Sequence, residues 1–119
     1  MHGLVIRERI LVMNGESQVT KTIFDEQIYK LTIDRAKQLD LRGHFVLQII
    51  KNKDGLHVIE CNPRIGGAST LAFAAGLNTP MWSIVEALGE DLVNYPFVPN
   101  SSTIQLVRTP VDTIFDSSI

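Results

Sequence analysis

The sequence predicts an α+β fold in which an antiparallel sheet has helices packed on one side. Two pairs of β-branched and aliphatic segments are each joined by a turn signal, Asn14-Gly15 in the first pair and the letters KDG at residues 53–55 in the second. A helical pattern separates the two pairs, and two shorter helical segments follow them. With 119 residues, the chain suits one compact domain or a piece of a larger one.

Composition excludes several classes of protein. A hydrophobic fraction of 45% is too high for a disordered segment, and a net charge of −2 gives no broad basic surface for DNA or RNA. No uncharged apolar stretch approaches the roughly 18 residues of a membrane helix, and nothing resembles a signal peptide. The single cysteine permits no internal disulfide. We therefore expect a cytoplasmic protein that contacts neither nucleic acid nor membrane.

The first strand pair carries two arginines on one face. Residues 4–12 and 17–24 read as strands, and Arg7 and Arg9 alternate along the first of them. Taken alone, two arginines on one strand face can be an ordinary solvated surface.

A helix is predicted from an N-cap at Asp25 to about Leu39. Its apolar residues Ile28, Leu31, Ala36 and Leu39 fall within one stripe, which we expect to face the core.

The second hairpin, with strands at residues 44–52 and 56–61, has two alternative registers. A two-residue Asp54-Gly55 turn would place Ile49 opposite Glu60. A three-residue loop over 53–55, with Gly55 in the left-handed conformation, places Gln48 opposite Glu60 instead.

The second register separates the two faces of the hairpin, and a slip of one residue would mix them. We therefore expect the three-residue loop. It puts the oxygen-bearing side chains of Gln48, Glu60 and Asn62 together, a ligand set suited to magnesium. Val46, Ile50 and Val58 share that face, and the opposite face is apolar: Phe45, Leu47, Ile49, Ile59 and Cys61.

The segment that follows suits a phosphate. Pro63 ends the strand because it cannot donate to a ladder, and Arg64 comes just past that end. Gly66 and Gly67 lead into a short helix, where exposed backbone N–H groups can approach an anion. The residues themselves thus predict a metal–phosphate site with Arg64 beside it.

Turn and cap signals define the rest of the chain. The short helix begins near Ala68 and stops at Gly76. Thr79 as N-cap and Pro80 as first helical residue open another helix, which Gly89 closes. A loop with two prolines and a final strand at 103–109 follow this helix.

Residues 43–80, GHFVLQIIKNKDGLHVIECNPRIGGASTLAFAAGLNTP, resemble the C-terminal lobe of the ATP-grasp enzymes. The closest likeness is to the branch that contains the carbamoyl-phosphate synthase large subunit and carboxylate-amine ligases. This likeness rests mainly on residues Glu60–Arg64, which follow a strand that contains Gln48. In addition, residues 5–16, VIRERILVMNGE, resemble the strand pair of these enzymes in which arginines precede a Gly-Glu turn.

The resemblance implies a role for each position. Glu60 would bridge two magnesium ions at the nucleotide, Gln48 would be a weaker ligand, and Asn62 would complete the second metal; Mn²⁺ can take the place of Mg²⁺. Arg64 would be catalytic and steady the transferring phosphate or acyl-phosphate. Arg7 and Arg9 lie where relatives contact phosphate or a substrate carboxylate.

The implied reaction is an ATP-dependent ligation. A carboxylate attacks the γ-phosphate of ATP to give an acyl-phosphate, and an amine or ammonia then displaces phosphate. Such chemistry depends on positioning and charge neutralisation. The alternative is a non-catalytic module that keeps the lobe to bind a partner or a regulatory nucleotide.

The implied domain plan makes residues 1–119 one lobe, with its motifs at 4–89 and a loop and closing strand at 90–119. The N-terminal nucleotide lobe and the domain that precedes it in relatives have no counterpart in this sequence. We therefore expect no activity from the chain alone, and we expect a missing lobe, a partner subunit or a second copy to cover it.

Overall fold

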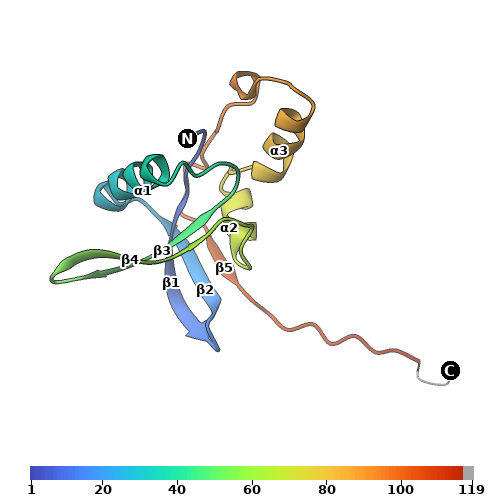
Figure 1. Ribbon diagram of the computed structural model, residues 1–119. Helices are drawn as coiled ribbons and strands as arrows, with labels where there is room; N and C mark the ends of the chain where they lie inside the picture. Colours follow the sequence, from blue (N-terminus) through green and yellow to red (C-terminus); the bar gives the residue numbers. More distant parts are fainter. Residues whose placement is uncertain (117–119) are drawn as a thin grey trace.

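The computed structural model describes residues 1–116 and confirms the α+β class, with three α-helices and antiparallel strands (Figure 1). The elements, in chain order, are β1 (Ile6–Met13), β2 (Glu16–Ile23), α1 (Glu26–Gln38), β3 (Val46–Asn52), β4 (Gly55–Asn62), α2 (Ser69–Ala74), α3 (Thr79–Ala87), the 3₁₀ helix η1 (Leu92–Asn94) and β5 (Gln105–Val107).

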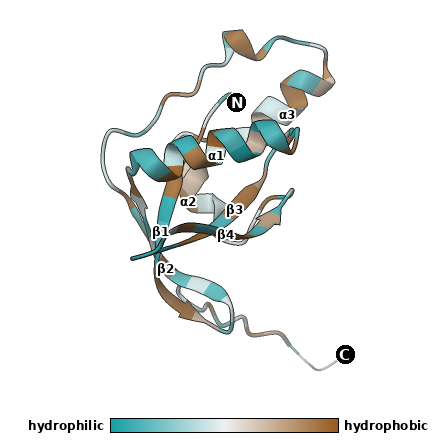
Figure 2. Ribbon diagram, turned by 60° about the vertical axis from the view of Figure 1, so that its left-hand side comes forward, coloured by the Kyte–Doolittle hydropathy of each residue, from teal (hydrophilic) through white to brown (hydrophobic). Residues whose placement is uncertain are grey.

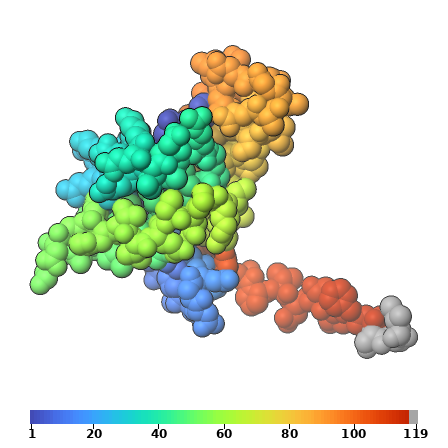
Figure 3. Space-filling model, viewed as in Figure 1, coloured from blue at the N-terminus to red at the C-terminus, as the bar shows by residue number. Residues whose placement is uncertain are grey.

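The strands form two antiparallel sheets. One has the order β1-β2-β5, and the other is the β3-β4 hairpin, which projects from the body of the molecule (Figures 1 and 3). The predicted final strand is shorter than expected, with only three residues, and it pairs with β2 through Val19↔Val107.

The turn signals and glycine stops are confirmed by the backbone. Asn14 and Gly15 both have positive φ, 51° and 78°, as a tight two-residue hairpin turn requires. Gly76 and Gly89 also have positive φ, 98° and 77°, just beyond α2 and α3.

Asp25 caps α1 as predicted and also ties it to the hairpin. Its Oδ1 accepts from the backbone N–H groups of Gln27 and Ile28, both at 3.0 Å, and its Oδ2 accepts from Lys51 Nζ at 2.6 Å. The hydrogen bond from Lys51, followed by the one from the Ile28 backbone, lowers the pKa of Asp25.

The predicted core stripe of α1 is correct except at its end. Ala36 is buried, and Ile28 and Leu31 are half-buried. Leu39 is 58% exposed because the helix ends at Gln38, so that Leu39 is the C-cap and leaves the stripe. Figure 2 shows hydrophilic residues along much of α1, with hydrophobic ones between them.

Replacing Asp25 with Ala should lower the thermal unfolding midpoint by roughly 5 °C, because both the cap and the link to Lys51 are lost. The pKa of Asp25 is depressed in the folded chain, so its contribution is present above the ordinary carboxyl value of 3.8 and is lost as the pH falls through the lowered value. Calorimetry from pH 7 to pH 2 should therefore show the two proteins converge. A constant difference would contradict the assignment.

The predicted pairing of Gln48 with Glu60 is confirmed, but the turn and the strand geometry that produce it differ from the prediction. Gln48 pairs with Glu60, Val46 pairs with Asn62, and Gly55 has φ 126°. The turn, however, contains only Lys53 and Asp54, since Asn52 pairs with Gly55.

A bulge in β4 compensates for the shorter turn. The register shifts between Gln48 and Ile49, so that Ile49 pairs with Val58 and Ile59 has no partner. Val58 therefore shares the face of Ile49, so its expected place beside Ile50 on the polar face is wrong, and the bulged Ile59 is 52% exposed.

The N-cap of α3 was predicted one residue too late. Asn78 takes that position and Thr79 is the first helical residue. The Thr79 hydroxyl is occupied elsewhere, because its Oγ1 lies 2.6 Å from His44 Nδ1.

The buried core of the described residues is small, and much apolar surface is exposed. Residues 10–13 of β1 are each between 43% and 57% exposed, and Ile84 and Leu88 project from α3 and its end. No helix of the described chain is long and apolar enough to cross a membrane. The buried apolar residues are Ala36, Leu71, Ala72, Ala75, Trp82 and Val85.

Candidate functional site

Three polar side chains meet across the β3-β4 hairpin as the sequence predicts. Glu60 Oε1 accepts from Asn62 Nδ2 at 2.8 Å. With the Gln48 amide oriented to satisfy its neighbours, its nitrogen donates to Glu60 Oε2 at 3.3 Å and its oxygen accepts from Arg9 Nη1 at 2.8 Å. The structure thus connects Gln48, Glu60, Asn62 and Arg9 directly.

The oxygen atoms of Gln48, Glu60 and Asn62 suit a hard cation that also binds water or phosphate oxygens. Glu60 is exposed, and a half rotation of either flanking amide presents an oxygen where a nitrogen now lies. Within residues 1–116, no group of three or more His, Cys, Asp and Glu side chains could hold a metal ion. A cation here would therefore have one carboxylate and two amides, and its remaining charge would favour phosphate oxygens.

Arg9 is held by neutral partners. Besides Gln48, its guanidinium donates from Nε to Ser17 Oγ at 2.9 Å and from Nη2 to the Gly15 carbonyl at 2.7 Å. These contacts fix the Arg9 guanidinium at the end of the β1-β2 turn, but they do not neutralise its positive charge.

Arg7 is a second arginine that forms no ion pair with a carboxylate among the described residues. It is half-buried, and its Nη1 donates to the Ala68 carbonyl oxygen at the start of α2. Burial, and then the charge of Arg9, lower the pKa of Arg7. Among the described residues, no acid forms an ion pair with Arg7 or Arg9. Two adjacent guanidinium groups with neutral partners favour an anion.

Buried hydrogen bonds anchor the glycine loop. Ser69 Oγ accepts from the Gly66 N–H at 3.0 Å and lies 3.2 Å from His44 Nε2. Burial, and then the charge of Arg7, lower the pKa of His44, which keeps the imidazole neutral at neutral pH. The Gly66 N–H is thus already used, and α2 has only six residues. The expected backbone cradle for an anion is therefore weaker than the sequence suggested.

Arg64 is not connected to the other predicted residues. Its backbone N–H donates to the Asn62 carbonyl at 2.8 Å, which turns the chain around Pro63 as expected. Its exposed side chain donates to the Ile65 carbonyl at 3.2 Å and has no described contact with Glu60.

Sequence reasoning gave no role to Arg108, which the structure brings to the glycine loop. Its backbone N–H donates to the Gln18 carbonyl at 2.8 Å, and its Nη1 donates to Glu16 Oε2 at 3.0 Å. Its Nη2 lies 2.8 Å from where a side-chain Cβ would stand at Gly67. The only sequence signal was an arginine in the last strand, whose partner strand could not be identified without the fold.

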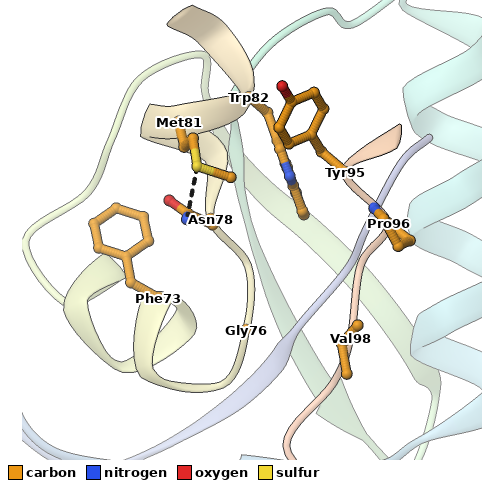
Figure 4. Close-up of a pocket in the computed structure, with 8 residues that line it drawn as sticks. All are labelled: Phe73, Gly76, Asn78, Met81, Trp82, Tyr95, Pro96 and Val98. Atoms are coloured by element: carbon orange, nitrogen blue, oxygen red, sulfur yellow. Dashed lines mark hydrogen bonds between the residues drawn. The ribbon is translucent and has the colours of Figure 1, made fainter. Parts of the chain in front are cut away.

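A separate open hollow of about 480 Å³ lies between α2, α3 and the segment after η1 (Figure 4). Its wall includes the rings of Phe73, Trp82 and Tyr95, and Asn78 donates to Met81 Sδ at its rim. None of the predicted site residues lines it, so the polar cluster on the hairpin is the candidate site.

Comparison with known proteins identifies a family. A family model described as "ATP-grasp in the biosynthetic pathway with Ter operon" matches residues 2–110, a range that includes every residue of the polar cluster. No curated protein matches the chain.

Proposed function

The chain belongs to the ATP-grasp family, and we propose that it is the metal- and phosphate-binding C-terminal lobe of an ATP-dependent carboxylate-amine or ammonia ligase. The carbamoyl-phosphate synthase large subunit is the proposed likeness within that family. One observation carries the proposal: Gln48, Glu60 and Asn62 gather oxygen ligands next to two arginines that form no ion pair with an acid among residues 1–116.

We assign two magnesium ions to this face, with Mn²⁺ as a substitute. Glu60 would bridge them, Gln48 would contact the first and Asn62 the second. When bound, the ions neutralise negative charge on the phosphates of ATP. The single carboxylate supports the requirement for the nucleotide, because the protein alone supplies too little charge to hold two divalent ions.

The arginines orient the anionic groups. Arg9 is fixed by Gly15, Ser17 and Gln48 and so presents a rigid guanidinium next to the metal ligands. Arg7 and Arg9 would hold phosphate or the substrate carboxylate. Arg64, whose exposed side chain makes a single contact with the neighbouring Ile65 carbonyl, would turn toward the phosphoryl group that is transferred.

Exposed apolar surface supports a role as one lobe of a larger unit. Residues 10–13 and the hairpin residues Ile50 and Ile59 are close to half exposed. A nucleotide lobe, a partner subunit or a second copy of the chain would cover such surface.

Residues 1–119 alone should bind magnesium–ATP with a dissociation constant weaker than about 1 μM, because they supply only one wall of the nucleotide cleft. Calorimetry with and without Mg²⁺ measures this directly, and the weak binding should require the metal. Sub-micromolar affinity would contradict the assignment of a single lobe. ATP binding of equal affinity with and without Mg²⁺ would contradict the metal site.

A further inference from the structure

We propose that Arg108 is a third oxyanion-binding side chain of this site, seated over Gly67, where it takes a carboxylate or phosphoryl group. The inference rests on the proposed function and extends it to the closing strand, for which the sequence gave no role. Carboxylate and phosphoryl oxygens present the same chemistry to a guanidinium fork.

The sheet register places the three arginines on one face. Arg9 pairs with Thr20, and Thr20 pairs with Leu106 across β2. Residues two apart on a strand share a face, so Arg7 lies on the same face as Arg9, and Arg108 lies on the same face as Leu106. The three guanidinium groups therefore extend across one side of the β1-β2-β5 sheet.

The glycine loop lies on that same face. Arg7 donates to the Ala68 carbonyl, Arg108 lies against Gly67, and Arg9 contacts Gln48 of the hairpin. Arg7 and Arg108 thus contact the segment that joins the proposed metal ligands to α2, and Arg9 contacts one of those ligands.

Gly67 provides the space for the guanidinium. Its φ is not in the left-handed region, so the backbone does not require glycine at this position. A Cβ there would approach Arg108 Nη2 to 2.8 Å, and the arginine would have to move. The structure therefore depends on glycine here for the position of Arg108.

Glu16 orients Arg108 through one nitrogen of the guanidinium and leaves the other N–H donors for a ligand. The pair uses Nη1, and the guanidinium carries five N–H donors. The Arg108 side chain is 31% exposed and can still receive a ligand. Glu16 and Glu60 together offset two of the three arginine charges on this face, which leaves a net positive charge for an oxyanion.

The test uses residues 1–119 labelled with ¹⁵N and titrated with inorganic phosphate. Phosphate should shift the amide signals of Gly66 and Gly67. Arg108→Met should weaken binding by about tenfold, which is typical of one lost charge-assisted hydrogen bond. The matched control is Arg42→Met, because Arg42 is an exposed arginine that pairs with Asp40 at 3.4 Å. It should change the affinity by less than about twofold.

Gly67→Ala keeps every charge and displaces the guanidinium. It should weaken phosphate binding by a similar factor, with the unfolding temperature unchanged. Equal effects of Arg108→Met and Arg42→Met, or unchanged binding in Gly67→Ala, would overturn the proposal.

Failure of this inference is distinguishable from failure of the proposed function. If Arg9→Met abolishes the phosphate shifts but Arg108→Met and Gly67→Ala leave them intact, Arg108 has no such role and the proposed function stands. If phosphate shifts neither glycine in the unsubstituted chain, this inference is wrong, whereas the proposed function is contradicted only if binding of ATP is independent of Mg²⁺.

Discussion

Glu60→Gln should lower the affinity of the hairpin for Mn²⁺ by about 100-fold or more, beyond the loss expected from an outer-shell change. Glu60 is the only carboxylate of the cluster, and its two oxygens accept from Asn62 and Gln48. The substitution leaves three amides, which lack the negative charge that a divalent cation requires. Electron paramagnetic resonance of free Mn²⁺, recorded with and without ATP, measures the loss.

Glu8→Gln is the matched control. Glu8 is an exposed carboxylate that pairs with Lys21 at 3.1 Å on the opposite face of β1, and its replacement changes the net charge equally. Mn²⁺ affinity should be retained in this variant. A similar loss in both would show that the cation responds only to net charge.

Arg64→Lys should lower kcat of the ligase that carries this lobe by about 10²-fold. Lysine keeps the charge but loses the planar fork that suits a phosphoryl group. The KM for ATP should change little, because under the proposed function magnesium and Glu60 would hold the triphosphate. The rate of ADP formation with saturating carboxylate and amine measures both constants.

Arg42→Lys serves as the control, because Arg42 is exposed and pairs with Asp40, which is not part of the cluster. If Arg64→Lys raised the KM for ATP and left kcat intact, Arg64 would be a ground-state nucleotide contact. The transition-state role would then be wrong.

Local signals predicted much of this fold because they depend on neighbouring residues. Asn14-Gly15 specified a tight turn, and Asp25 specified the start of α1. Gln48 and Glu60 were predicted to pair because their register separates polar from apolar side chains near the site.

Other features depend on contacts between distant segments. The turn at 53–54 is one residue shorter than predicted, and the bulge at Ile59 restores the register, so two errors cancelled at Glu60. Asn78 and not Thr79 is the N-cap of α3, and the Thr79 hydroxyl lies 2.6 Å from a nitrogen of His44, which is 35 residues away. Arg108 was not singled out because its position against Gly67 depends on the pairing of β5 with β2.

The proposed function requires a divalent cation on the hairpin face of Glu60. Crystals soaked in Mn²⁺ and ATP should therefore give an anomalous difference peak within about 2.3 Å of a Glu60 oxygen, with the Asn62 or Gln48 amide turned so that its oxygen faces the ion. Peaks found only elsewhere, with both amide nitrogens still donating to Glu60, would contradict it.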